Sequence, residues 1–215
     1  MNPGYLSIWI MTILFILIAT GWKSQIAPDL GPRMLKVWMG VCLLAMTNVP
    51  LWWTPAPEYL HAALHVSVWL LLLTSITTYK GTEEWSYVGY LILCALMIAI
   101  IWGFIRKIYS YDPVFYWIDP RWDAPLLAGI FCGAFTAQFK QQCGMLIWGA
   151  VLGEALNSVL QTGAYTAQIG SLSWWDSFWV ALSAARLFSL LVKGIKLAIT
   201  KLNGFCWPSK GGRSS

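Results

Sequence analysis

The sequence contains few charged residues, and acidic residues are the scarcest of them. Only 11% of its 215 residues are Asp, Glu, Lys or Arg, and 9 are acidic. Soluble domains carry about 25% charged residues, so the composition argues against a soluble globular domain. With 58% hydrophobic residues and a mean hydropathy of +0.62, the sequence instead predicts a protein embedded in lipid.

The motifs of the common enzyme classes are also missing. The sequence has no Gly-rich phosphate-binding loop, no G-x-S-x-G, no H-E-x-x-H and no C-x-x-C. His61 and His65 are four residues apart, but no Cys, Asp or third His at close spacing completes a metal site. We therefore expect no enzymatic activity, no cofactor and no bound metal, and we interpret the two histidines as interfacial or packing residues on one helix face.

The apolar residues fall into seven stretches separated by polar or proline-containing connections. They predict an all-α fold, a polytopic membrane bundle of about seven transmembrane helices in a single domain, residues 1–192. No Lys or Arg precedes the first stretch, so we interpret it as a retained helix and not as a cleaved signal peptide. The predicted spans are residues 5–22, 33–53, 58–79, 85–105, 124–139, 143–162 and 174–192.

The positions of the basic residues orient the predicted bundle. If the N-terminus lies outside, most Lys and Arg residues of the connections fall on the cytoplasmic side, together with the basic C-terminal segment. Only Arg106, Lys107 and Arg121 remain outside. Because cytoplasmic loops are enriched in Lys and Arg, we expect an external N-terminus and a cytoplasmic C-terminus. The basic segment also accounts for the net charge of +5, so no nucleic-acid partner is implied.

The last part of the chain changes from apolar to basic. An S-x-x-D capping box, Ser173 with Asp176, predicts the start of the last span. Residues 193–207 alternate lysines with Ile and Leu, which is typical of a basic amphipathic segment lying on a membrane surface. We expect this segment to bind anionic lipid headgroups. Residues 208–215 lack apolar periodicity, which predicts a disordered tail.

The stretch from Ala124 to Gly163 predicts a helical hairpin. Its only polar break, residues 140–142, is interpreted as the turn between two antiparallel helices. Two small-xxx-small pairs stand at equal distances from Gln141, so we expect them to meet at the same depth and let the two helices approach closely. These pairs are Gly129 with Gly133 and Gly149 with Gly153.

The second helix of this hairpin carries Glu154, the one acidic residue placed deep inside a predicted span. Asn157 and Gln161 follow at helical spacing, so the three side chains share one face. Ionisable groups inside a membrane face protein or water and not lipid. The polar line is therefore either a structural seam, closed by an ion pair between Glu154 and Arg186 of the last span, or part of a path for a proton or small solute.

The connection between the fourth and fifth spans mixes six aromatic residues with three aspartates. Its two Asp-Pro pairs favour turns or helix starts. We expect a short interfacial helix with its rings toward the acyl chains and its aspartates on the wet side. The alternative is a cap over the bundle that faces a substrate. The residues assigned to this segment are Asp112, Trp117, Asp119, Arg121 and Trp122.

The same connection resembles a known family. Residues 112–119, Asp-Pro-Val-Phe-Tyr-Trp-Ile-Asp, lead to Arg121-Trp122 in a chain with seven short spans and 15 tryptophans. This combination resembles the YphA-like small membrane proteins of Bacillus-type bacteria. The resemblance covers most of the chain except the basic segment from Lys193 onward. It implies a bacterial plasma-membrane location and carries no catalytic residue over to this sequence.

Two functions from different classes follow from the sequence. The first is a non-enzymatic accessory or assembly component of the membrane, which binds a membrane-protein partner or a second copy of the chain. The alternative is a small transporter or proton-coupled permeation unit that uses Glu154. The surroundings of Glu154 discriminate between them, because a dry helix contact favours the first function and a water-filled cavity favours the second.

Overall fold

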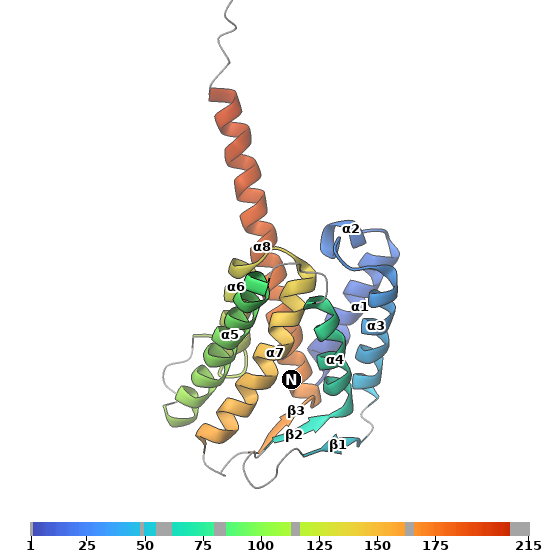
Figure 1. Ribbon diagram of the computed structural model, residues 1–215, viewed down its shortest axis with the longest axis vertical. Helices are drawn as coiled ribbons and strands as arrows, with labels where there is room; N and C mark the ends of the chain where they lie inside the picture. The colour runs from blue at the N-terminus through green and yellow to red at the C-terminus, as the bar shows by residue number, and fades with distance from the viewer. Residues whose placement is uncertain are drawn as a thin grey trace, which may run out of the picture.

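The computed structural model describes residues 2–47, 50–54, 62–79, 85–112, 117–161 and 166–206, with only the backbone of residues 77–79 and 202–206. Within these residues the chain forms helices and three short strands (Figure 1), which confirms the predicted all-α class apart from a small sheet. The helices are α1 (Tyr5–Ala19), α2 (Lys23–Ile26), α3 (Pro32–Met46), α4 (Val66–Tyr79), α5 (Trp85–Tyr111), α6 (Asp123–Phe135), α7 (Phe139–Leu160) and α8 (Leu172–Cys206). The strands are β1 (Trp52–Trp53), β2 (Ala62–His65) and β3 (Ala167–Ile169).

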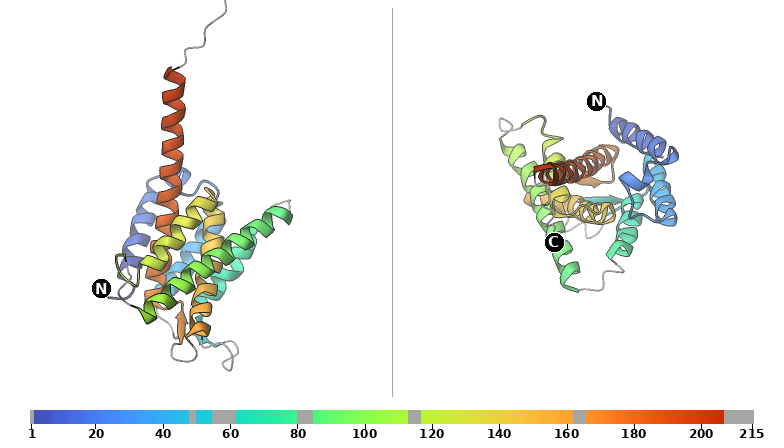
Figure 2. Two further views of the ribbon diagram at one scale, coloured as in Figure 1. Left: turned by 90° about the vertical axis from the view of Figure 1, so that its left-hand side faces the viewer. Right: turned by 90° about the horizontal axis from the view of Figure 1, so that it is seen from above.

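The bundle is built on two close helix pairs. α5 packs along α7, and α6 packs along α8. The shorter helix α1 packs against α8, and α3 packs against α4. Seen from above, α1 and α3 occupy one edge of the bundle (Figure 2). Large side chains such as Trp102 of α5, Met145 of α7 and Trp175 of α8 are fully buried. The core therefore lies between α5, α7 and α8.

Three helices are long and apolar enough to cross a membrane by length and composition. They are α5, α7 and the part of α8 that ends at Lys201. α1, α6 and the part of α4 that ends at Ile76 are also apolar but shorter. Large apolar side chains on the outer surface, for example Phe15 of α1 and Leu93 of α5, are exposed. An outer surface of this kind is typical of a protein that contacts lipid.

A small sheet, which the sequence did not predict, closes one end of the bundle. β2 pairs antiparallel with β1 and parallel with β3. The predicted span 33–53 is therefore too long, because α3 ends at Met46. In the predicted span 58–79, residues 62–65 form a strand and α4 follows from Val66, while residues 58–61 lie outside the described residues. The short apolar run that forms β2 has no periodicity that would separate a buried strand from a helix.

His65 lies at the end of β2, which corrects its predicted place on a helix face. Its ring contacts that of Trp52, with 5.2 Å between the centroids, and its Nδ1 lies 2.7 Å from Oγ of Ser67. His61 lies outside the described residues. Among the residues that the structure describes, no group of three or more His, Cys, Asp or Glu side chains could hold a metal ion. The contacts of the buried His65 ring are those of a packing residue.

The turn of the central hairpin lies earlier than predicted. It covers residues 136–138, so Gln141 and Gln142 belong to the first turn of α7. Oε1 of Gln141 accepts hydrogen bonds from Tyr87 (2.9 Å) and Thr136 (2.7 Å), and Nε2 of Gln142 donates to the Thr136 carbonyl (2.7 Å). Because Gln141 and Gln142 find hydrogen-bond partners inside the bundle, the polar run does not have to form the turn.

The last helix continues well past the predicted end of its span. α8 runs without interruption to Cys206, and its C-terminal part projects beyond the other helices (Figure 1). Residues 193–201 are exposed. We call the end of the bundle that carries α2 and this projection the α2 end. The opposite end, with the three strands and the N-terminus, is called the sheet end.

Candidate functional site

The buried carboxylate of Glu154 is the centre of a small charged cluster near the sheet end. Glu154 is 2% exposed and forms an ion pair with Arg106 of α5. Its Oε1 also accepts a hydrogen bond of 3.2 Å from Nε1 of Trp102. Arg106 lies over the Trp102 ring, 5.3 Å from the centroid, and donates to Oγ of Ser177 at 3.1 Å. The cluster thus joins α5, α7 and α8.

Glycines on α5 and α7 make this cluster possible. A Cβ added at Gly103 would lie 2.6 Å from the carbonyl oxygen of Gly153, and a Cβ at Gly153 would lie 2.7 Å from Cβ of Trp102. Both distances are too short for a real side chain, so the two backbones touch directly. The close approach places Trp102 and Arg106, which are one helical turn apart, against Glu154 of the facing helix.

The predicted ion pair between Glu154 and Arg186 is wrong. Arg186 lies near the α2 end, where it donates hydrogen bonds to the carbonyl oxygens of Ala137 (3.0 Å) and Gln25 (2.9 Å). α7 begins at Phe139, so a rise of about 1.5 Å per residue places Glu154 about 22 Å from that end. The long side chain of Arg186 cannot cover this difference in depth.

The actual partner, Arg106, was assigned to the outer connection because the apolar stretch stops at Ile105. The helix itself continues to Tyr111, so the guanidinium remains beside the bundle, with 20% of its side chain exposed. A signal was present in the sequence, since Trp102 and Arg106 stand four residues apart and form an aromatic and cationic pair on one helix face. Hydropathy alone does not register such a pair.

The polar line on α7 leads from Glu154 to the sheet end. Asn157 is buried, and its Oδ1 accepts a hydrogen bond of 2.8 Å from Nε2 of Gln161 at the end of the helix. Among the described residues, no hydrogen-bond partner reaches Oε2 of Glu154 or Nε of Arg106. The structure therefore brings Glu154, Asn157 and Gln161 onto one face and leaves Arg186 outside the group.

The two predicted glycine pairs lie in close contacts, but not with each other. Gly129 and Gly133 of α6 face α8, where a Cβ at Gly133 would lie 2.5 Å from the carbonyl oxygen of Ala185. Gly149 and Gly153 of α7 face α5. The predicted meeting of the pairs across the hairpin is therefore wrong, because each hairpin helix packs closely on a different neighbour.

The aromatic connection forms turns where an interfacial helix was predicted. Residues 117–122 contain no helix, and residues 113–116 lie outside the described residues. Trp117 is 83% exposed, and Asp119 accepts a hydrogen bond of 2.8 Å from the backbone nitrogen of Arg121. Trp122 precedes the first residue of α6. Asp112 follows the last residue of α5.

The residue that organises this connection is Asp123, which the sequence interpretation did not single out. Its buried carboxylate accepts hydrogen bonds from the backbone nitrogens of Trp117 (2.6 Å) and Ile118 (3.1 Å) and from the hydroxyl of Tyr109 (3.1 Å). A negatively charged carboxylate at the first residue of α6 also interacts favourably with the positive N-terminal end of the helix dipole. These contacts hold the connection against the bundle and indicate a structural role.

A second structural carboxylate, Asp176, caps a helix far away in the sequence. Its Oδ2 accepts a hydrogen bond from the backbone nitrogen of Gly4 (2.7 Å). Its Oδ1 accepts from the nitrogen (2.8 Å) and the hydroxyl (2.6 Å) of Ser7. The predicted capping box with Ser173 is therefore wrong, since Asp176 satisfies the free N–H groups at the start of α1 and not those of its own helix.

Comparisons with known proteins give one match. No curated protein and no solved structure matches the chain. The family model of the YphA-like integral membrane proteins matches residues 3–205, which includes residues 193–205 of the basic segment that the sequence resemblance did not reach. The long apolar helices and the exposed apolar surface described above are consistent with an integral membrane protein. The chain belongs to the family of YphA-like integral membrane proteins.

Proposed function

We propose that the protein is a non-enzymatic, multi-pass component of a bacterial plasma membrane that acts by binding another membrane protein or a second copy of itself. The observation that carries this proposal is the setting of Glu154. Its carboxylate is almost completely buried, paired with Arg106 and hydrogen-bonded to Trp102. A carboxylate that is buried and paired in this way stabilises a helix contact.

Two apolar cavities of the bundle agree with the same function. One cavity lies between α1, α3 and α8, and another lies between α4, α5 and α7. Glu154 lines neither of them. A transport path through the described part of the chain would require the Arg106 pair to open, and leaving one of these charges unpaired inside the membrane costs several kcal/mol.

The distribution of charge supports an external sheet end and a cytoplasmic α2 end. Each charged residue is assigned to one end of the bundle by the helix or connection that carries it (Figure 1). Basic residues outnumber acidic ones at the α2 end, where Asp29 is the one acidic residue that the structure describes. The basic residues there are Lys23, Arg33, Lys36, Lys140, Arg186, Lys193, Lys196 and Lys201. The sheet end holds Arg106, Lys107 and Arg121 together with Asp112, Asp119, Asp123, Glu154 and Asp176. This asymmetry follows the positive-inside rule.

Seven crossings remain our interpretation of the path of the chain. α1 and α3 have 15 residues each and α6 has 13, so they extend over only about 20–22 Å, less than the roughly 30 Å of a hydrocarbon core. Short spans are accommodated by local thinning of the bilayer at a modest cost. The connecting segments at the two ends would then lie at the level of the headgroups.

Transport is the second candidate function, and one observation favours it. Oε2 of Glu154 has no partner among the described residues, and the polar line through Asn157 leads to the sheet end. A proton entering from that end could reach the carboxylate if Arg106 moved away. The two functions therefore differ in whether the ion pair opens.

Proton flux in liposomes separates the two functions. Purified protein, reconstituted with an imposed pH gradient, is expected to conduct no more than empty liposomes. A flux that disappears in Glu154→Gln and persists in Asp119→Asn would overturn the accessory role. In native membranes we expect a stoichiometric complex with one membrane protein or a homo-oligomer, and a strictly monomeric chain would also contradict the proposal.

A further inference from the structure

An apolar cavity of about 290 Å³ lies between α1, α3 and α8, away from Glu154. Met11 of α1, Trp38 and Cys42 of α3, and Trp179 of α8 form its walls, and Ile26 of α2 lies at one end. An apolar cavity of about 150 Å³ already admits benzene, and pockets for small molecules begin at about 300 Å³. The space is therefore large enough for part of an apolar ligand.

This cavity opens sideways toward the outer surface of the bundle. Phe15 of α1 and Leu43 of α3 line it and are 58% and 61% exposed. Trp38, Cys42 and Trp179 line its inner side and are buried. In an integral membrane protein the outer surface faces hydrocarbon, and the lining has too few polar groups to hold ordered water. The expected occupant is therefore apolar and enters from the bilayer.

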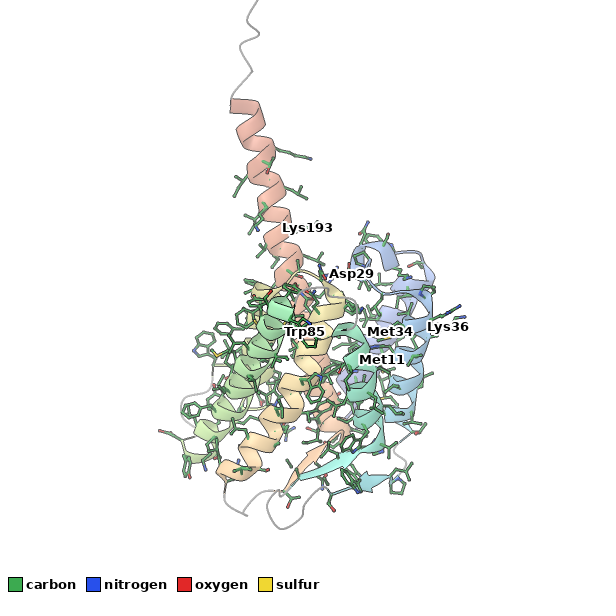
Figure 3. All side chains as sticks on the ribbon, in the orientation of Figure 1. Met11, Asp29, Met34, Lys36, Trp85 and Lys193 are labelled. Carbon is green, nitrogen blue, oxygen red and sulfur yellow. The ribbon has the colours of Figure 1, made fainter. Side chains whose placement is uncertain are left out.

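Three cations lie close to the end of the cavity nearest α2. Lys23 is within one helical turn of Ile26, and Arg33 and Lys36 are within one turn of Leu35, two residues that line the cavity; Lys36 projects outward from the bundle (Figure 3). The nearby carboxylate of Asp29 accepts a hydrogen bond of 2.9 Å from the backbone nitrogen of Phe139. Within the described residues, none of the three cations forms an ion pair. They are thus available to an anionic group outside the protein.

We propose that this cavity binds one acyl chain of an anionic membrane phospholipid whose phosphate lies against Lys23, Arg33 and Lys36. The cavity follows α3 from Leu35 to Leu43, a length of about 12 Å at the rise of an α-helix. It begins within one turn of Arg33, so a chain lying in it places its headgroup beside the cations. The proposed lipid site depends on the protein being embedded in a membrane, and it does not depend on the accessory role.

Lipid retention by purified protein tests the site. The protein is incubated with either phosphatidylglycerol or phosphatidylcholine of identical acyl chains, washed in detergent and examined by native mass spectrometry. We expect wild-type protein to retain a stoichiometric amount of phosphatidylglycerol and several-fold less phosphatidylcholine. Retention of neither lipid would overturn the site, and equal retention of both would overturn the role of the three cations.

A pair of neighbouring variants locates the bound chain. Thr12 lies at the exposed rim of the cavity and donates its hydroxyl to Ile8 of its own helix (2.7 Å), so Thr12→Phe should obstruct the opening and reduce retention several-fold. Ile13 is exposed outside the cavity, and Ile13→Phe should leave retention unchanged. Equal retention by the two variants would contradict the proposal. A dimer that Thr12→Phe converts to monomers would also contradict it, because the occupant would then be a second copy.

Cys42 provides an independent measurement on wild-type protein. This buried thiol lines the cavity, so a small membrane-permeant maleimide that alkylates it from the cavity occupies the space that the lipid would fill. The reaction is run at alkaline pH, until alkylation without lipid is measurable, because maleimide reacts with the thiolate. Added phosphatidylglycerol should slow the alkylation of Cys42 several-fold, as followed by peptide mass spectrometry, whereas phosphatidylcholine should have a much smaller effect. Alkylation at the same rate with and without phosphatidylglycerol would exclude the site even if Thr12→Phe does not fold.

Discussion

Two regions of this bundle, the α5–α7 contact and the space between α1 and α3, are packed in opposite ways. α5 and α7 touch through their backbones at Gly103 and Gly153, and a charged cluster lies beside that contact. α1 and α3 are lined by large side chains such as Phe15 and Trp38, and a cavity remains between them. In a membrane, helices are held together by close packing and polar contacts, since lipid is as apolar as the side chains it replaces. The first region is therefore expected to be rigid and the second to accept a ligand.

This difference predicts which contacts contribute most to the free energy of unfolding. At the α5–α7 contact, an added side-chain atom has no space because the helices are closely packed. A charge that loses its partner there is not solvated by water. At the α1–α3 cavity, an added atom enters an existing space and displaces lipid. Substitutions at the first contact should consequently cost far more than substitutions at the second.

The largest effect is expected when the charged cluster loses Arg106. Arg106→Leu leaves the buried carboxylate of Glu154 without a countercharge and with only the hydrogen bond from Trp102, which should destabilise the protein by about 3–5 kcal/mol. Glu154→Leu should cost clearly less, because the Arg106 side chain is 20% exposed and keeps its contact with Ser177. The double variant should recover much of the loss. The measurement is the free energy of unfolding in mixed detergent.

Arg121 supplies the control for this experiment. It is an exposed arginine at the same end of the bundle, and Arg121→Leu should change the free energy of unfolding by less than about 0.5 kcal/mol. If Arg106→Leu were as harmless as Arg121→Leu, Glu154 would have to be in contact with water. The comparison between the two regions would then lose its physical basis.

The next effect concerns the glycine contact itself. Gly103→Leu would force α5 away from the carbonyl oxygen of Gly153 and should cost about 3 kcal/mol. Gly89 lies on the same helix with no atom within 4 Å of an added Cβ, so Gly89→Leu should be nearly neutral. Thermal unfolding midpoints in detergent would compare the two variants. Similar midpoints would show that the backbone contact does not limit stability.

An intermediate effect is expected where α1 is fastened to α8. Asp176→Ala removes the acceptor for the N–H groups of Gly4 and Ser7 and should cost about 1–2 kcal/mol. Amide hydrogen exchange should accelerate mainly in the first turn of α1. Asp119→Ala removes only the bond to the Arg121 nitrogen and should leave α1 protected. Exchange that increases equally throughout the bundle would contradict a local cap.

The long apolar helices were predictable from the sequence because their apolar runs exceed the length of any buried strand. α5 and α8 contain the spans expected at 85–105 and 174–192, and α7 covers residues 143–160 of the span expected at 143–162. The strands were missed because each is only two to four residues long and because β2 pairs with β3 about one hundred positions further along the chain. A run of three or four residues carries no periodicity that reveals such a partner.

The candidate site was only half predictable, since side-chain chemistry is local and helix neighbours are not. Glu154 was identified because a carboxylate in an apolar run is rare. Its partner depends on which helices touch, and the symmetric glycine spacing suggested the wrong neighbours. In the structure Gly149 and Gly153 face α5 and bring Arg106 within reach, whereas Arg186 lies at the other end of the bundle. Asp176 illustrates the same limit, because a local capping pattern served a distant helix.

The smallest effect is expected at the cavity between α1 and α3. In delipidated protein, Thr12→Phe should change the free energy of unfolding by less than about 0.5 kcal/mol, because Thr and Phe have similar helix propensities and the ring enters existing space. The lost hydroxyl donated only to a carbonyl of its own helix, which retains its backbone bonding. Equilibrium unfolding of Thr12→Phe and Gly103→Leu under the same conditions would compare their free energies of unfolding directly. A cost for Thr12→Phe close to that of Gly103→Leu would mean that α1 and α3 are already tightly packed, and the two regions would then not differ in kind.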